Sequence, residues 1–158
     1  ATEDSFAKRF VWNYYNRVPR PMRVLEATDT WAYSTATVRQ ARATTTNQLD
    51  VVIGVAEDRV EIDVHAIGQN DTAGQNLMVG IGEDSTTATA TGALTPFVAV
   101  PVANYYVNMR ASLKTIPAVG RHYYVWLERG SGTGTTTWSG DAGSPTVAQS
   151  GIFGTVFG

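Results

Sequence analysis

The chain contains no cysteine, and this absence excludes disulfide bonds and metal sites built from thiolates. Small secreted scaffolds often depend on disulfides, so this protein must depend on its hydrophobic core or on assembly into an oligomer. Histidine is also scarce, with two residues in a chain of 158. Because histidine is the usual side chain for acid–base chemistry and metal binding near neutral pH, the chain offers few candidates for either role.

Charged residues make up only 16% of the chain, against about 25% in an average soluble domain. The net charge of −2 gives no global attraction to nucleic acid or to a membrane surface. No apolar run approaches the roughly 20 residues that a membrane-spanning helix needs, and the acidic start Ala1–Asp4 does not fit a signal peptide. We therefore expect a soluble protein with no membrane span and no nucleic-acid partner.

A β pattern runs along the chain from about residue 30 onward. Apolar and polar residues alternate most clearly from Val60 to Ala66, with Glu61, Asp63 and His65 on the opposite face. Other short runs follow, separated by segments rich in Gly, Asn, Asp and Pro. The pattern predicts an all-β fold, a jelly-roll-like two-sheet sandwich over residues 27–158.

Residues 1–26 differ in character, because they hold five of the twelve basic residues and five aromatic residues. The spacing of the aromatic residues fits both a helix and a strand, and the choice stays open for residues 5–18. Pro19 and Pro21 predict an extended segment. We interpret residues 1–26 as an N-terminal arm or first strand that docks onto another protein, and expect the fold to survive removal of residues 1–22. The predicted docking residues are Phe10, Trp12, Tyr14, Tyr15 and Arg20.

The motifs of the common enzyme classes are absent from the sequence. His65 shares a strand face with Asp63 and Glu61, but a metal site needs three or four converging ligands. The chain has no Gly-x-Ser-x-Gly elbow, and no carboxylate pair stands out as that of a glycosidase. The Gly-rich runs lack the lysine and helix start of a phosphate-binding loop. We therefore expect a protein that is not an enzyme, with no catalytic residues, metal site or cofactor.

Aromatic residues on the late strands point instead to interfaces. Tyr124 and Trp126 share one face of a strand that is apolar on both sides, and Phe153 and Phe157 share one face of the last strand. A second subunit that covers such faces would explain the pattern, so we expect these four residues to pack between subunits. A thick core with scattered surface aromatics is the alternative. Trp138, beside a Gly-rich loop, is the candidate for contact with a glycan.

Several segments resemble a recurring module of tailed-bacteriophage virion proteins, in which it often ends a longer structural chain. The resemblance covers roughly residues 14–158. It rests on residues 16–22 (Asn-Arg-Val-Pro-Arg-Pro-Met), 28–33 (Thr-Asp-Thr-Trp-Ala-Tyr), 53–57 (Ile-Gly-Val-Ala-Glu), 82–86 (Gly-Glu-Asp-Ser-Thr), 117–123 (Pro-Ala-Val-Gly-Arg-His-Tyr), 134–138 (Gly-Thr-Thr-Thr-Trp), 140–141 (Gly-Asp) and 149–151 (Gln-Ser-Gly).

This resemblance implies a structural component of the virion surface, assembled in the host cytoplasm. A capsid decoration protein, a head fibre or spike, and a tail-fibre tip all fit it. Such proteins are commonly trimeric β-structures, so we expect a homo-oligomer, with a trimer favoured, bound to the major capsid protein or another virion protein. The alternative is a tail-fibre or adhesin module that binds host-surface carbohydrate. No catalytic residues come with the resemblance.

Overall fold

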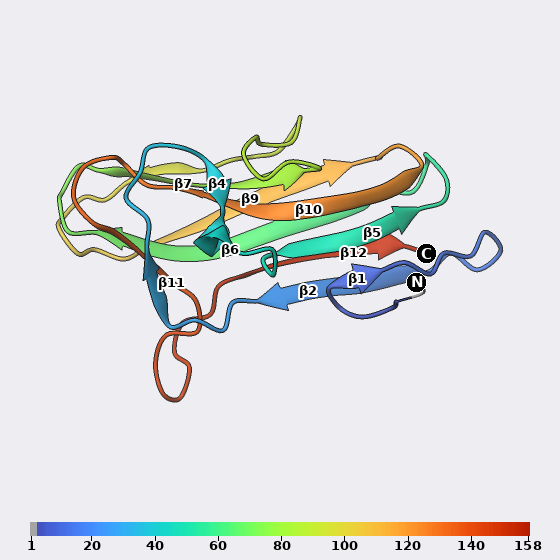
Figure 1. The fold of residues 1–158 in the computed structure, drawn as a ribbon, viewed down its shortest axis with the longest axis horizontal. Helices are drawn as coiled ribbons and strands as arrows, with labels where there is room; N and C mark the ends of the chain where they lie inside the picture. Colours follow the sequence, from blue (N-terminus) through green and yellow to red (C-terminus); the bar gives the residue numbers. More distant parts are fainter. Residues whose placement is uncertain (1–2) are drawn as a thin grey trace.

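The computed structural model describes residues 3–158, and these form two β-sheets packed face to face (Figure 1). The prediction of an all-β two-sheet sandwich is confirmed. The first sheet, called sheet A, contains β1 (Lys8–Arg9), β4 (Arg39–Gln40), β5 (Gln48–Ile53), β7 (Asn76–Glu83), β8 (Phe97–Ala99) and β10 (Gly120–Arg129). Sheet B contains β2 (Pro19–Leu25), β3 (Thr30–Ala32), β6 (Val60–Asn70), β9 (Val107–Thr115), β11 (Thr136–Ser139) and β12 (Gly151–Phe157). One short 3₁₀ turn, η1 (Ala41–Ala43), follows β4.

The longest strands form the centre of each sheet. In sheet A, β10 lies between β5 and β7, and β4 pairs with the far end of β10 beyond β5. In sheet B, β6 pairs with β9 along one side, while β12 and β11 share its other side end to end. The chain crosses from one sheet to the other between β5, β6 and β7 and again between β9, β10 and β11. This crossing makes the two sheets one cooperative unit, because neither sheet is built from a continuous stretch of chain.

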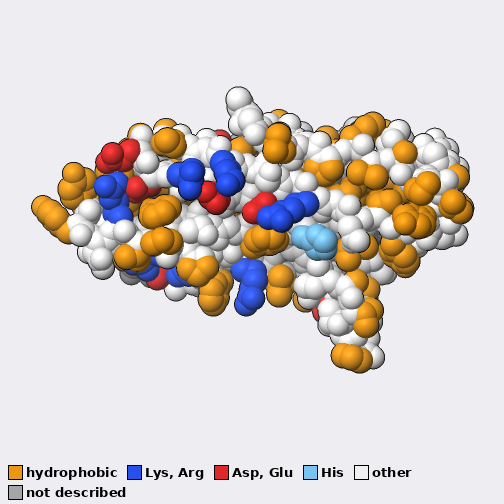
Figure 2. Space-filling model, turned by 180° about the vertical axis from the view of Figure 1, so that it is seen from behind, with side chains coloured by type: hydrophobic (Ala, Val, Ile, Leu, Met, Phe, Trp, Pro, Cys, Tyr) orange, Lys and Arg blue, Asp and Glu red, His pale blue; other side chains and the backbone are white. Residues whose placement is uncertain are grey.

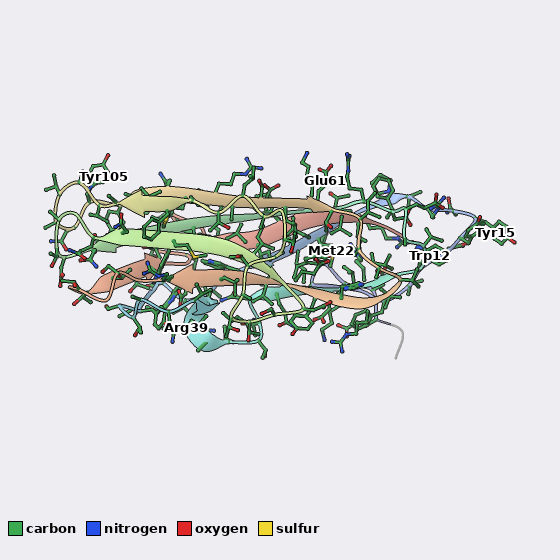
Figure 3. All side chains as sticks on the ribbon, turned by 90° about the horizontal axis from the view of Figure 1, so that it is seen from above. Trp12, Tyr15, Met22, Arg39, Glu61 and Tyr105 are labelled. Carbon is green, nitrogen blue, oxygen red and sulfur yellow. The ribbon has the colours of Figure 1, made fainter. Side chains whose placement is uncertain are left out.

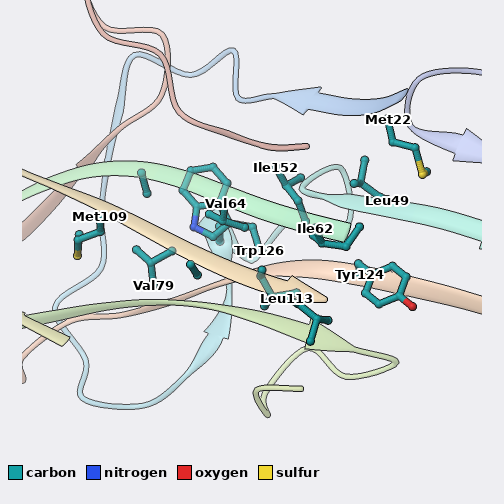
Figure 4. Close-up of a cluster of buried hydrophobic side chains, with 14 of the residues drawn as sticks. Met22, Leu49, Ile62, Val64, Val79, Met109, Leu113, Tyr124, Trp126 and Ile152 are labelled. Carbon is teal, nitrogen blue, oxygen red and sulfur yellow. The ribbon is translucent and has the colours of Figure 1, made fainter. Parts of the chain in front are cut away.

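The core lies between the sheets and follows the alternation of β6. Val60, Ile62 and Val64 are buried, and Glu61, Asp63 and His65 lie on the outer face of sheet B. Burial of each such aliphatic side chain contributes about 1.5–3 kcal/mol. Side chains from both sheets meet in the same cluster, where Figure 4 shows residues of β5, β6, β7, β9, β10 and β12 together.

Strand β10 is apolar on both faces, as its sequence indicates, but the chain itself covers both. Tyr124 and Trp126 are fully buried in the core between the sheets. Leu127 on the opposite face packs against Gly80 and Gly82, beneath the loop that follows β7. The prediction that Tyr124 and Trp126 pack between subunits is therefore wrong, because neither has surface left for a second chain.

Residues 3–9 close one open side of the sandwich. The Phe6 carbonyl accepts a hydrogen bond from the backbone N–H of Arg23 in sheet B (2.8 Å), and the Ala7 carbonyl accepts one from Asp50 in sheet A (2.9 Å). β1 then adds a parallel edge to β5, and β2 pairs with all of β12. Residues 5–18 form no helix, and β1 is their only strand.

This arrangement corrects the interpretation of the N-terminal segment as a removable arm. A chain without residues 1–22 would lack β1, half of β2 and the buried side chain of Met22. The expectation that such a truncation leaves the fold intact is wrong, since the deleted strands complete both sheets. A test of docking therefore needs point substitutions.

Candidate docking surface

A cluster of aromatic residues forms one end of the molecule, and we call residues 12–17 the aromatic tip. Tyr14 and Tyr15 occupy a turn, with exposed fractions of 57% and 94%. Tyr15 marks one extreme of the long axis of the molecule, and Tyr105 lies at the opposite extreme (Figure 3). Three of the predicted docking residues, Trp12, Tyr14 and Tyr15, are therefore brought together at one exposed place.

The aromatic tip is fixed to the body of the sandwich. The Trp12 ring lies directly on Gly54, just after β5, and its Nε1–H donates to Asp58 (3.4 Å). Arg17 pairs with the same carboxylate group at 2.8 Å and lies over the Tyr14 ring, 5.7 Å from its centroid. Edge-to-face contacts join Trp12 to Tyr14 and Tyr14 to Tyr15. Tyr14 is thus packed between Trp12 and Arg17 before any partner arrives, which lowers the entropy that it loses on binding.

Two other predicted docking residues lie outside the aromatic tip. Phe10 is half-buried, and the Arg121 guanidinium lies 5.6 Å from its ring centroid. Arg20 donates from Nε to the Gly158 carbonyl (2.8 Å) and pairs with Asp4 (3.1 Å). Both side chains therefore make contacts within the chain. Arg20 joins the N-terminal segment, through Asp4, to Gly158.

The outer face of sheet B carries alternating charges. Figure 2 shows Lys and Arg side chains next to Asp and Glu across this face. Asp63 pairs with Arg110 (3.1 Å), and Glu61 pairs with Arg59 (2.7 Å) and Lys114 (3.6 Å). The carboxylates beside His65 are thus engaged in exposed ion pairs. Within residues 3–158 no group of three His, Asp or Glu residues lies close enough to hold a metal ion.

Phe153 and Phe157 lie on this same outer face, and both are half-buried. The Arg110 guanidinium lies 6.0 Å from the Phe153 ring centroid. Phe157 lines a hollow with Asp58 and Ile116, next to the aromatic tip. Both phenylalanines keep surface that a second chain could cover, and their predicted role between subunits stays a prediction.

Trp138 is fully buried in sheet B. Its ring packs over Gly68, which is its cross-strand neighbour in β6, and any Cβ at Gly68 would meet that ring at 3.1 Å. The predicted glycan contact at Trp138 is therefore wrong, because the indole has no exposed surface on which a sugar could stack.

Two buried glutamates, which the sequence does not reveal, form a polar network beside the core. Glu128 is fully buried and accepts hydrogen bonds from Trp31 Nε1 (2.7 Å), Arg39 Nε (2.9 Å) and the backbone N–H of Arg42 (3.0 Å). Burial raises the pKa of Glu128, and the hydrogen bonds from Trp31 and Arg39 only partly offset it. The partners lie up to 97 residues apart, so no local pattern signals them.

Glu26 is the second carboxylate of this network. It accepts hydrogen bonds from Asn47 Nδ2 (2.7 Å), Arg42 Nε (3.0 Å) and the backbone N–H of Thr28 (2.9 Å). Burial opposes its charge, but these hydrogen bonds outweigh burial and lower the pKa of Glu26. Arg42 adopts a left-handed conformation (φ 58°) that lets its backbone reach one glutamate and its side chain the other. The network therefore has a structural role, in which it fixes η1 against both sheets.

A further polar contact lies outside this network, between the half-buried His122 of β10 and the exposed Asp84. The His122 Nδ1 lies 2.7 Å from Asp84 Oδ2, and the His122 Nε2 lies 2.8 Å from the Ala118 carbonyl. Both partners are acceptors, so only the doubly protonated imidazolium satisfies both contacts. Burial disfavours this charge, yet the two hydrogen bonds prevail and raise the pKa of His122.

No protein-family model and no curated protein matches the chain. Across residues 3–158, the structure contains no helix that is both long and apolar enough to cross a membrane.

Proposed function

We propose that this chain is a non-enzymatic structural protein on the surface of a tailed-phage virion, where it decorates the capsid or forms part of a head fibre. Its aromatic tip docks onto the major capsid protein or another virion protein. The observation that carries the proposal is the exposed Tyr14–Tyr15 pair on a turn that Trp12 and Arg17 anchor to Asp58. The resemblance of residues 14–158 to virion modules supplies the biological setting.

Physical chemistry supports docking through this tip. Tyrosine is enriched at protein interfaces because its large ring is mostly apolar while its hydroxyl can still form a hydrogen bond. Trp12 and Arg17 contact the Tyr14 ring, which reduces the side-chain freedom that Tyr14 would lose on binding. The tip also projects at an extreme of the long axis, where a flat partner could reach it without touching the sheets (Figure 3).

The test is a decoration assay with purified phage heads that lack the protein. The chain is added, unbound protein is removed, and the bound copies per head are counted by quantitative gel densitometry. We expect the double substitution Tyr14→Ser with Tyr15→Ser to weaken binding by about tenfold or more, the usual effect at a buried aromatic anchor. The matched control, Tyr105→Ser with Tyr106→Ser, changes an exposed pair at the other end and should bind like the unmodified chain. Equal binding by both double variants would contradict docking through the aromatic tip.

A second candidate function is glycan binding by the opposite end, and one observation favours it. A hollow of about 360 Å³ lies there, lined by Ile67, Tyr106, Asn108 and Val147 among others. Tyr106 is 56% exposed, so its ring can stack on a sugar while the Asn108 amide binds hydroxyls. A glycan array separates the two functions, since Tyr106→Ala should abolish glycan binding and leave head decoration unchanged.

A further inference from the structure

Arg23 differs from the other cations of the chain. Ten of the twelve lysines and arginines pair with a carboxylate, and Arg129 donates to the Ala36 carbonyl at 3.2 Å. Among residues 3–158, only the Arg23 guanidinium has neither a carboxylate nor any other hydrogen-bond acceptor; it lies over the Phe6 ring, 5.4 Å from the ring centroid. A guanidinium carries five N–H donors, so Arg23 presents all of them unpaired at an exposed position.

The same guanidinium borders a hollow of about 340 Å³, which we call the Arg23 pocket. This volume lies within the range of about 300–1,000 Å³ that is usual for ligand sites. Two aromatic rings line it from different parts of the chain, and other arginines hold both: Arg9 lies 5.5 Å from the Phe6 ring and Arg110 lies 6.0 Å from that of Phe153. The full lining is Phe6, Pro21, Met22, Arg23, Phe153 and Gly154.

We infer that the Arg23 pocket binds a segment of a partner protein in which an apolar side chain stands next to a carboxylate. The unpaired guanidinium matches a carboxylate through two parallel hydrogen bonds. The rings of Phe6 and Phe153 supply an apolar surface for the body of the ligand. Arg23 is the only side chain in the lining with polar donors, so the hydroxyls of a sugar would find few partners, and this favours a peptide. The pocket adds a contact to the proposed virion role but does not depend on it, because small molecules can test it.

The experiment is an NMR titration of the ¹⁵N-labelled full chain with N-acetyl-L-phenylalanine, whose carboxylate stands beside an apolar ring. We expect saturable shifts of the Arg23 Nε–H and Gly154 amide signals at millimolar concentration. The neutral analogue N-acetyl-L-phenylalaninamide should bind about tenfold more weakly, since it lacks the charge-assisted hydrogen bonds. Arg23→Gln should show the same loss with the acid, and Phe6→Ala should also weaken binding. Arg59→Gln makes the same charge change on the same sheet face and should bind normally.

Three results would overturn the inference. Equal affinities for the acid and the amide, or an unchanged affinity in Arg23→Gln, would show that the guanidinium does not select the ligand. Sodium glucuronate that binds as tightly as N-acetyl-L-phenylalanine would assign the pocket to acidic carbohydrate. A lower native mass of Arg23→Gln by light scattering would show that a second copy of this chain covers the pocket. None of these results depends on phage heads, so failure here leaves the proposed function to its own test.

Discussion

The indole ring of Trp12 occupies the space that a side chain at Gly54 would fill. A Cβ added at Gly54 would overlap the Trp12 ring itself, so the strand end and the aromatic tip fit together only because residue 54 is glycine. Forty-two positions separate the two residues, and this contact joins the N-terminal segment to the end of β5. It therefore links the rigidity of the candidate docking surface to a residue that takes no part in docking.

The first prediction follows from this contact. Gly54→Ala should displace the Trp12 ring and lower the free energy of unfolding by about 1–3 kcal/mol, as overpacking usually does. The Trp12 indole N–H signal in an NMR spectrum should move, because its hydrogen bond to Asp58 breaks when the ring shifts. Urea unfolding and the indole spectrum together measure the two effects.

A double-mutant cycle provides the control for Gly54→Ala. If the clash with the ring is the cause, adding Gly54→Ala to a Trp12→Ala chain should cost much less than it does in the unmodified chain. Additive losses would show that Gly54 acts through some other property, such as backbone freedom, and would contradict the proposed contact.

The sequence predicts much of the fold because its strongest signals are local. Alternation from Val60 to Ala66 predicts a strand, and that strand forms the centre of sheet B. The apolar run around Trp126 likewise predicts β10. Both predictions need only the two-residue period of a strand and the turn residues at its ends.

What covers each strand face depends on distant parts of the chain, and here the sequence is insufficient. Tyr124 and Trp126 are buried in the core between the sheets, and the loop after β7 covers Leu127 on the opposite face of β10. Neither face of the strand therefore needs a second subunit. Trp138 resembles a surface residue because Gly, Thr and Ser surround it in the sequence, yet it is buried in the core between the sheets, with its ring over Gly68 of β6. The sequence shows directly that the tip is rich in aromatic residues. It does not show that Trp12 packs on Gly54, because this contact joins distant parts of the chain.

The second prediction concerns the buried network around Glu128. Glu128→Gln replaces one acceptor oxygen by an NH₂ group, which then faces the N–H donors of Trp31, Arg39 or Arg42. Leaving buried donors and a cation without their acceptor should lower the free energy of unfolding by about 2–4 kcal/mol. Glu61→Gln is the matched control, since it removes exposed ion pairs worth about 0–1 kcal/mol. Similar losses in both variants, measured by urea unfolding, would contradict the structural role of the network.

The third prediction is that the free energy of unfolding depends on pH through the protonation of His122. Folding raises the pKa of this ring, because the hydrogen bonds to Asp84 and Ala118 outweigh its burial. A raised pKa stabilises the folded state fully below the ordinary histidine pKa of about 6.5. This stabilisation is lost as the pH rises through the raised value of the folded state. Urea unfolding between pH 6 and pH 9 should show this decline.

Two histidine variants identify the group responsible for that decline. His122→Gln should flatten the change in stability above pH 6.5, because the titrating ring is gone. His65→Gln removes the other histidine of the chain, on the outer face of sheet B, and should keep the decline. If the decline persisted in His122→Gln and vanished in His65→Gln, His65 would be the group responsible. That result would refute the proposal that the contact between His122 and Asp84 causes the decline.

The last prediction is the oligomeric state. Phe157 is half-buried on the outer face of β12, and exposed Ile116 lines the same hollow. A stable interface buries about 1,200–2,000 Å² in total around such apolar residues. We expect light scattering on a sizing column to give three times the 17.0 kDa of one chain, because the virion proteins that the chain resembles are commonly trimeric and a closed oligomer would cover this hollow in every copy. Phe157→Ser should reduce the mass to that of a monomer, whereas Phe97→Ser, which changes an exposed phenylalanine of sheet A, should leave the trimer intact. A native mass of 17.0 kDa for the unmodified chain would rule the trimer out and leave Phe157 as surface available to a different partner.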